Sequence, residues 1–315
     1  MIQNHVTSPT TQKKVNSASS ISNSPPYSPT PKNKRKRTPH SDPIMSDSPS
    51  RFLWSAASTS GSRKTENDDS FLVFSAGVSG ATQLDHTSES LLDTEDLVFA
   101  VSDGMGGGNA GYLASSLILK ALTFLIPKTF KTAAQGFHPD YLELLEAQIK
   151  EIHHSINEKA ESSNEFKGMG ATLTLAWFTP ENLYVAHAGD SRLYLHRDGQ
   201  TQQITHDHSF EWRKLHRGEI NERQYRTSPK RSVLCEVIGG GHRRVRPDVA
   251  AIPYQKGDRF MLCSDGIIDG CWEKHIHKAL SQNTDSTSAT ADALMTRAIE
   301  NDGSDDTTLI VLDVR

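Results

Sequence analysis

The stretch Leu97-Val98-Phe99-Ala100-Val101-Ser102-Asp103-Gly104-Met105-Gly106-Gly107 joins an apolar run to an aspartate and a glycine-rich turn. Consecutive apolar residues, in place of alternating ones, predict a strand that is covered on both faces. The same pattern recurs at residues 309–312, near the C-terminus. Further apolar runs predict strands at residues 71–74, 173–178, 183–186, 192–196, 259–263 and 308–314.

Helical spacing of apolar residues supplies elements that can cover such strands. Apolar residues recur every three or four positions in residues 110–126 and 141–156, and more weakly in residues 290–300. Helices gathered in blocks between runs of strands indicate an α+β fold with antiparallel sheets. Residues 183–186 and 192–196 flank Gly189-Asp190-Ser191, and this arrangement predicts a hairpin.

The first fifty residues have a different composition. They are rich in Ser, Thr, Pro and Lys and contain only scattered apolar residues, so we expect a disordered tail at 1–50 and a single folded domain at 51–315. The tail contains Lys34-Arg35-Lys36-Arg37 between Ser-Pro and Thr-Pro dipeptides. This basic run is either a nuclear-import or polyanion-binding patch or simply a solvated tail. We favour the solvated tail, because short basic runs often match by chance.

Composition excludes several classes of protein. The formal net charge of −4 does not suggest a nucleic-acid partner. The three cysteines form no CxxC pair, which argues against a disulfide framework or a zinc site and suits a reducing compartment. We find no apolar leader and no apolar run approaching the ~18 residues needed to cross a bilayer. These features predict a soluble cytoplasmic protein without a membrane partner.

Aspartates stand at the ends of predicted strands. Asp103 and Asp265 each follow a strand directly, and Asp305 precedes the last one. If that last strand runs antiparallel to the other two, these carboxylates meet at one edge of the sheets. Asp68 and Asp69, just before the strand that starts at residue 71, would join the same edge.

Like charges gather in this way only when cations neutralise them. Carboxylate and carbonyl oxygens select Mg²⁺ or Mn²⁺ over zinc, and Gly104 leaves room for its backbone carbonyl to reach a metal. Two such ions roughly 4 Å apart generate a hydroxide nucleophile and clamp a phosphoryl group. Arg63 could hold phosphate oxygens with its planar guanidinium.

Seven segments in order resemble the metal-dependent type-2C protein phosphatases, the PPM family. The match covers about residues 60–315. The segments are RKTENDDS (63–70), VSDGMGG (101–107), GATL (170–173), AGDSR (188–192), THDHS (205–209), LCSDG (262–266) and SDDTT (304–308).

The resemblance implies a four-layer α-β-β-α sandwich of two antiparallel sheets flanked by helices. It implies hydrolysis of phosphoserine and phosphothreonine in proteins by water that two Mn²⁺ or Mg²⁺ ions activate. Arg63 would bind substrate phosphate, Asp103 would bridge both metals, and Gly104 would offer its carbonyl. The remaining implied ligands are Asp265 and Asp305 for the first metal, Asp69 and Asp68 for the second, and Asp190 for a third, weaker ion.

The chain departs from the family pattern at three positions. Met105, which makes the DGMGG motif bacterial-like, stands where many eukaryotic members have a histidine that could act as general acid. Asp306 stands where asparagine is commoner and adds a negative charge beside Asp305. Asp68 stands where Glu or Gln is usual, and its shorter reach weakens the case for a ligand role.

The resemblance also bears on partners and on rival functions. We expect a phosphorylated protein substrate, a Ser/Thr kinase acting in opposition, and a monomer. One rival is a pseudophosphatase that only binds; intact Asp103, Asp265 and Asp305 argue against it. A second rival is a nucleic-acid or import-receptor ligand that acts through the basic tail.

Two further motifs have ordinary structural interpretations. Gly239-Gly240-Gly241 suggests a phosphate-cradling loop but lacks the Lys-Ser/Thr of a P-loop, so we expect a flexible turn. His206 and His208 have no third nitrogen or sulfur ligand at zinc spacing, so we expect them to be scaffold near the site.

Overall fold

The computed structural model describes residues 50–134, 140–282 and 286–315. The predicted tail, with its basic run at Lys34-Arg35-Lys36-Arg37, lies outside the described residues. Of the predicted tail at 1–50, only residue 50 is described, so the domain boundary after residue 50 stays a prediction.

Two six-stranded sheets, in which every pairing is antiparallel, form the centre of the fold. The first sheet has the order β11-β10-β14-β15-β1-β4, with strands at Gln200–Gln203, Arg192–Arg197, Arg259–Cys263, Thr307–Val314, Arg51–Thr59 and Thr87–Leu91. The second has the order β13-β9-β8-β5-β2-β3, with strands at Asp248–Ile252, Leu183–Ala188, Leu173–Phe178, Asp96–Ser102, Ser70–Gly77 and Gly80–Gln83.

Strand β5 shows why a strand that is covered on both faces has consecutive apolar residues. All seven of its residues are buried. Val98 and Ala100 belong to the core beneath the helices on one side, whereas Leu97, Phe99 and Val101 belong to the core between the sheets. Because side chains alternate between the two faces of a strand, both faces of β5 must be apolar.

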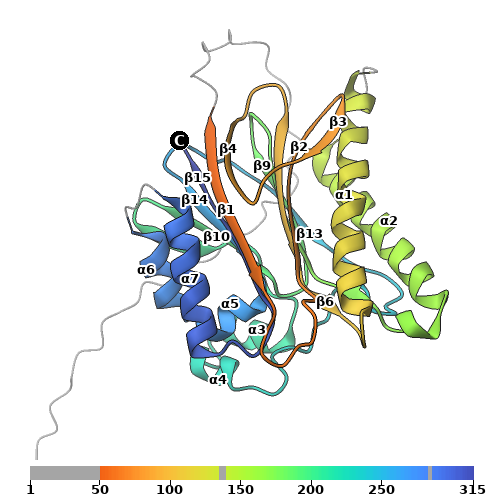
Figure 1. Cartoon of the computed structure of the whole chain (residues 1–315), viewed down its shortest axis with the longest axis vertical. Helices are drawn as coiled ribbons and strands as arrows, with labels where there is room; N and C mark the ends of the chain where they lie inside the picture. Colours follow the sequence, from red (N-terminus) through yellow and green to blue (C-terminus); the bar gives the residue numbers. More distant parts are fainter. Residues whose placement is uncertain (1–49, 135–139, 283–285) are drawn as a thin grey trace, which may run out of the picture. The chain divides into compact units, whose positions relative to one another are not determined.

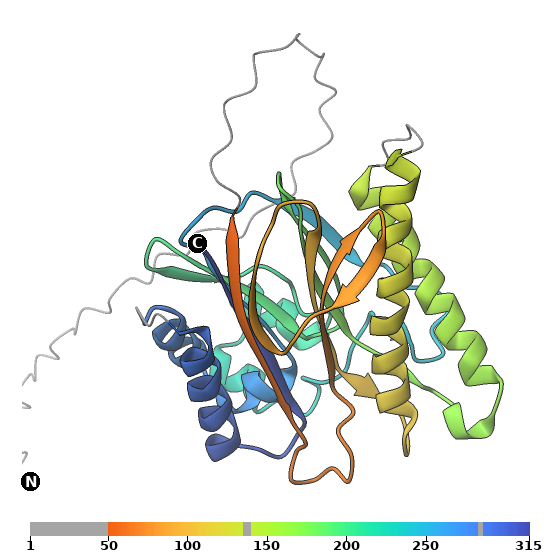
Figure 2. The same ribbon diagram turned by 45° about the horizontal axis from the view of Figure 1, so that its top comes forward.

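Helices cover the outer face of each sheet, as Figures 1 and 2 show. Helices α1 (Ala110–Ala134) and α2 (Tyr141–Glu161) pack on the second sheet. Helices α5 (Asp265–Gly270), α6 (Glu273–Leu280) and α7 (Thr287–Asn301) pack on the first. The expected four-layer α-β-β-α sandwich is therefore confirmed.

Helix α1 corrects the expectation that no apolar segment is long enough to cross a bilayer. Its segment Ala110–Thr132 is long and apolar enough, by length and composition alone, to cross a membrane. Of the most apolar 18-residue stretch of this segment, 56% is buried in the protein. Ala114, Ile118 and Leu122 lie in the core. The helix thus has the packing expected of a core helix.

A third, three-stranded sheet was not predicted. It has the order β12-β7-β6, with strands at Ile238–Gly239, Gly170–Ala171 and Gly104–Met105. Each strand has only two residues, which is too short to give a periodic signal. Short helices α3 (Phe210–His216) and α4 (Glu222–Arg226) and the 3₁₀ turn η1 (Asn164–Phe166) complete the described elements.

The hairpin predicted around Gly189-Asp190-Ser191 is wrong. Strand β9 pairs with β8 and β13 in the second sheet, whereas β10 pairs with β11 and β14 in the first. The chain therefore crosses from one sheet to the other at Asp190. Two short apolar runs around a glycine turn carry no information on which sheet each run joins, so the sequence could not distinguish the two cases.

Candidate metal centre

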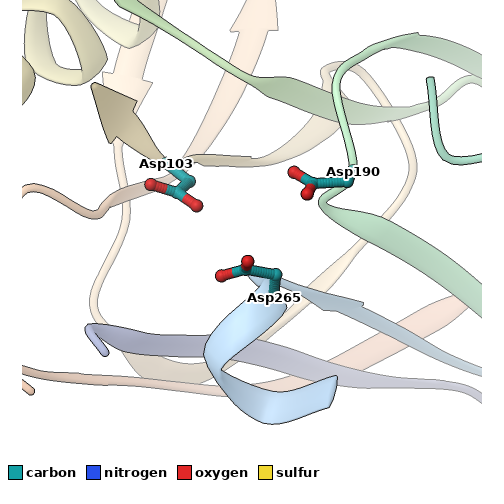
Figure 3. A group of neighbouring side chains, drawn as sticks. All are labelled: Asp103, Asp190 and Asp265. Carbon is teal, nitrogen blue, oxygen red and sulfur yellow. The ribbon is translucent and has the colours of Figure 1, made fainter. Parts of the chain in front are cut away.

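Three carboxylates converge between the ends of the two large sheets. Asp103 follows β5, Asp190 lies between β9 and β10, and Asp265 begins α5. One carboxylate oxygen from each lies within 4.8 Å of the others, and Figure 3 shows the three groups pointing toward a common space. Strands of different sheets deliver Asp103 and Asp265, as their positions at strand ends predicted, and the crossover adds Asp190.

Asp69 lies beside this group. It directly precedes β2, whose Ser70 pairs with Ser102 of β5, so the register places it next to Asp103. The hydroxyl of Ser264 donates a 2.6 Å hydrogen bond to Oδ2 of Asp69. Its Oδ1 is buried and has no hydrogen-bond partner among the described residues. A buried, unpartnered carboxylate oxygen is costly unless a cation binds it.

Burial, and after it the proximity of the carboxylates to one another, changes the pKa values of these groups. Burial raises the pKa of Asp103 well above its usual range, and neighbouring carboxylates, Asp69 foremost, raise it further. Burial raises the pKa of Asp69 and of Asp190 to about 7 in each case, even though Ser264 counteracts the shift at Asp69. Burial and then Asp190 raise the pKa of Asp265. The site thus disfavours ionised carboxylates, and a bound divalent cation would reverse that preference.

Asp305 lies at the open side of the group. Its side chain is 44% exposed, and its carboxylate contributes to the raised pKa of Asp103. Strand β15, which follows it, runs antiparallel to β14, which leads to Asp265. This is the relative direction needed to bring Asp305 and Asp265 to one edge.

The structure places Asp68 differently from Asp69. Its Oδ1 accepts a 3.0 Å hydrogen bond from the backbone N–H of Tyr112, in the first turn of α1, and its Oδ2 lies 3.3 Å from Nζ of Lys64. These contacts leave Asp68 outside the group of three carboxylates. Gly111 of α1 permits this contact, because a Cβ there would lie 2.8 Å from the Asp68 carboxylate.

Gly104 also needs its lack of a side chain. A Cβ at this position would lie 2.2 Å from the carbonyl oxygen of Gly111, so a larger residue would separate β6 from α1. The backbone N–H of Gly104 donates to the carbonyl of Asp68. The tight contact holds the chain after Asp103 in place.

Two basic side chains, Lys64 and Arg231, reach the carboxylates, and neither was predicted from the sequence to do so. Nζ of Lys64 lies 3.3 Å from Asp68, 3.4 Å from Asp305 and 3.8 Å from Asp306. Partial burial disfavours the ammonium, but the carboxylates, Asp305 first, raise the pKa of Lys64.

Arg231 is the second basic residue. It lies 3.5 Å from Asp265 and pairs with Asp269. It follows α4 in a charged segment far from either aspartate in sequence, so spacing alone could not have identified it. Arg63, the predicted phosphate ligand, is exposed, and its backbone N–H donates a hydrogen bond to the carbonyl of Ser304.

Supporting hydrogen bonds hold the loops that carry the carboxylates. The backbone N–H of Asp103 donates to the hydroxyl of Thr172, which lies 2.6 Å from the hydroxyl of Ser191. The backbone N–H of Gly189 donates to Nδ1 of His208, whose Nε2 lies 3.2 Å from Asp248. His208 therefore positions the crossover before Asp190, in agreement with the scaffold interpretation.

Comparison with known proteins decides the family. Residues 74–304 match the family model described as Protein phosphatase 2C. The chain belongs to the protein phosphatase 2C family. The resemblance to bacterial PPM members is confirmed.

Several phosphatase 2C relatives are bacterial. The chain is 33% identical over 219 residues to the serine/threonine protein phosphatase PstP of Mycobacterium tuberculosis, covering 69% of this chain and 40% of that protein. It is 31% identical to the serine/threonine phosphatase stp of Listeria welshimeri, covering 70% of this chain and 85% of that protein. The match thus spans less than half of the mycobacterial protein's length.

A solved phosphatase 2C structure carries metal. The catalytic domain of PstP in complex with two manganese ions is 28% identical, with a TM-score of 0.65, and the match covers 84% of this chain and 99% of that chain. The agreement extends the family assignment to the three-dimensional arrangement of the sheets.

Met105 and Asp306, two of the three departures from the family pattern, have distinct surroundings in this phosphatase 2C domain. Met105 is the last residue of β6 and pairs with Gly170. Its thioether has no proton to donate, so it cannot serve as a general acid. Asp306 is buried, and its two oxygens accept hydrogen bonds from the backbone N–H groups of Gly61 and Asp68.

Proposed function

We propose that the protein hydrolyses phosphoserine and phosphothreonine esters in other proteins, using two divalent cations held by its aspartates. The carboxylates of Asp103, Asp190 and Asp265 within 4.8 Å of one another carry this proposal. The donor atoms are all oxygen, which favours Mn²⁺ or Mg²⁺. The unpartnered Oδ1 of Asp69 fits a cation at the same place.

Each predicted ligand has a proposed part. Asp103 bridges the two ions, with the Gly104 carbonyl beside it, and Asp265 and Asp305 hold the first. Asp69 holds the second, and Asp68 supports it through water from its place beside α1. Asp190 holds a third, weaker ion. When bound, the ions balance the carboxylate charge and supply Lewis-acid activation for ester hydrolysis.

The protein's own cations orient the phosphate group. Lys64 already lies against the open side of the carboxylates, at Asp305, and we assign it the main contact with phosphate oxygens. Arg63 is adjacent in sequence and exposed, so we assign it a contact with the substrate only from outside the centre. An ammonium group offers a point charge and not the bidentate geometry of arginine.

The proposed partners follow from the reaction. The substrate is a phosphorylated protein, and a Ser/Thr kinase acts in opposition. We further propose that the protein is a monomer and that α1 serves as a core helix and not as a membrane span. The manganese ions of the PstP structure support Mn²⁺ as the cation, with Mg²⁺ as the alternative.

The test is hydrolysis of a phosphothreonine peptide with Mn²⁺, with Mg²⁺ and with EDTA. We expect turnover that requires metal and is abolished in Asp103→Asn, whereas Asp93→Asn, an exposed aspartate away from the centre, retains it. Metal binding without turnover on several phosphopeptides would instead make the pseudophosphatase the leading function.

The basic-tail alternative has its own test. Deletion of residues 1–50 leaves the turnover of a small aryl phosphate unchanged if the described domain carries the activity. A large loss of turnover on that small substrate would contradict the assignment of catalysis to residues 51–315.

A further inference from the structure

A polar pocket of about 450 Å³ lies at the C-terminal end of α2, away from the group of carboxylates. The end of α2, the turn η1 and the loop after β12 enclose it; α2 is labelled in Figure 1. Residues that matter here include Asn157, Glu161, Lys167, His242 and Arg243.

The glycine loop at one side of this pocket is held firmly, contrary to the flexible turn expected from the sequence. Gly239, Gly240 and Gly241 all have positive φ, from +65° to +79°. The N–H of Gly239 donates to Nδ1 of His153, and the N–H of Gly241 donates to Oδ1 of Asn157.

Further hydrogen bonds complete the attachment of this loop to α2. Nδ2 of Asn157 donates to the carbonyl of His242 at 2.9 Å, and Nε2 of His153 lies 2.9 Å from the same oxygen. The N–H of Gly240 donates to the carbonyl of Met169. Helix α2 and the chain before β7 thus fix the loop through its backbone.

Because of these hydrogen bonds, the backbone N–H groups of the glycine loop are not free to bind an anion. The amides of Gly239, Gly240 and Gly241 donate within the protein, and so does that of His242. An anion in the pocket would therefore be held by side chains, which gives the glycine motif a structural part and leaves the recognition to its neighbours.

Exposed basic side chains lie in this pocket and just after it in the chain. Lys167, Arg243, Arg244 and Arg246 are all exposed, and none of them forms an ion pair within residues 50–134, 140–282 and 286–315. Glu161 is the one carboxylate among the described lining residues. Among the lining residues, Lys167 and Arg243 stand against the single carboxylate of Glu161, so the pocket itself has a net positive charge.

The small sheet connects this pocket to the centre. Gly239 of β12 pairs with Gly170 of β7, which pairs with Met105 of β6, two residues after Asp103. Neighbouring strands are roughly 4.8 Å apart, so the loop begins about 10 Å from Met105. An extended peptide covers about 3.3 Å per residue. The step from Met105 to Gly239 thus equals about three extended residues, and the lining residues Gly241 and Arg243 follow Gly239 in the chain. On this spacing, a substrate with its phosphate at the centre would bring a residue some three to five positions away into the pocket.

We propose that this pocket binds an acidic group of the protein substrate, three to five residues from the phosphorylated residue. The group is a carboxylate or a second phosphate, and Lys167 and Arg243 hold it. This inference rests on the proposed phosphatase function and specifies its substrate class as phosphoproteins with an acidic flank.

The test compares phosphothreonine peptides that carry alanine, glutamate or phosphoserine four residues to either side. We expect kcat/KM to be roughly three- to tenfold higher for an acidic residue on one side, and to lose this advantage in Lys167→Ala/Arg243→Ala. Comparison of the glutamate peptide with the phosphoserine peptide shows whether the pocket prefers a carboxylate or a phosphate. Added salt should reduce the preference, because both side chains are exposed.

The matched control is Lys256→Ala/Arg297→Ala, which removes one exposed lysine and one exposed arginine that lie outside the pocket. It should retain the preference, and both double variants should hydrolyse a small aryl phosphate at the wild-type rate. Equal kcat/KM for all peptides, or an equal loss in the control, overturns the pocket proposal without affecting the proposed phosphatase function.

A binding measurement keeps the two proposals separable. Fluorescence anisotropy in EDTA, with a labelled peptide that bears several glutamates and no phosphate, measures the pocket without any turnover. Wild-type binding that weakens in the pocket variant and not in the control supports the site even if no phosphopeptide is hydrolysed. Indistinguishable binding by all three proteins rejects it.

Discussion

The carboxylate of Asp306 accepts a 2.7 Å hydrogen bond from the backbone N–H of Asp68, across 238 positions of sequence. Its other oxygen accepts from the N–H of Gly61 at 2.9 Å. Both ends of the loop that carries Lys64 are thus attached to one buried side chain. The loop also leads directly to Asp69, so Asp306 positions the entry to the centre.

Replacing Asp306 by Asn removes one of these two acceptors, and replacing it by Ala removes both. Hydrogen bonds to charged groups contribute about 1.5–3 kcal/mol each, so we expect the melting temperature to fall by roughly 3–10 °C for Asn and further for Ala. The melting temperature is measured in saturating Mn²⁺. Bound cations then neutralise the neighbouring carboxylates, so that removing the negative charge of Asp306 does not add stability that hides the loss of its hydrogen bonds. Asp93→Asn is the control, and an Asn variant as stable as wild type would contradict this account.

Metal binding has a readout that does not depend on activity. Mn²⁺ or Mg²⁺ should raise the melting temperature, because ions that bind only the folded state stabilise it, and EDTA should reverse the shift. Asp103→Asn removes a charge from the cluster, so we expect this variant to melt at a higher temperature than wild type in EDTA and to respond far less to Mn²⁺. A wild-type response to Mn²⁺ in this variant would exclude Asp103 as a ligand.

Lys64 and Arg63 can be separated by substitution. The ammonium of Lys64 lies against Asp305, whereas the Arg63 side chain is exposed. Lys64→Gln should therefore lower kcat/KM on a small aryl phosphate about 10- to 100-fold, the size expected for a charge-assisted hydrogen bond. Arg63→Gln should change it less than about threefold on that substrate. The reverse order would restore Arg63 as the main phosphate ligand.

A buried carboxylate far from the centre should make stability depend on pH. Asp96, at the start of β5, accepts a 2.7 Å hydrogen bond from Nε1 of Trp177, and burial raises its pKa to about 7. Between about pH 4 and pH 7 the folded state then holds a proton that the unfolded state has lost. This carboxyl group therefore destabilises the fold as pH rises through that window.

Asp96→Asn retains an acceptor for Trp177 and cannot ionise. The amount by which the variant's melting temperature exceeds that of wild type should grow by on the order of 5 °C between pH 5 and pH 8. Melting curves of both proteins across this range check the prediction. A difference that does not change with pH would show that Asp96 is already ionised in the folded protein at pH 5.

Much of the centre could be predicted because it depends on strand ends. Asp103 and Asp265 follow apolar runs whose burial on both faces is evident from composition, and an aspartate directly after such a run must emerge at the sheet edge. The directions of β14 and β15 then bring Asp305 to the same side. Family motifs supplied the rest of the proposed ligand set.

Other features depended on contacts that no local pattern encodes. Lys64 and Arg63 are neighbours with the same charge, and only the packing of their loop against Asp305 and Asp306 separates their environments. The tether from His153 and Asn157 to the glycine loop joins residues more than 80 positions apart. The three-glycine sequence is the same whether the loop is held by hydrogen bonds or is a flexible turn.

Periodicity and the order of the motifs were enough to predict the layered fold, the position of Asp103 and Asp265 at strand ends, and the phosphatase family. The tertiary structure alone decided that β9 and β10 belong to different sheets, so that Asp190 crosses between them into the centre. It also decided which lysine, arginine and serine reach the carboxylates. The physical reason is that strand partners and loop contacts are selected by packing over the whole chain, whereas a sequence pattern specifies only which face of its own element is apolar.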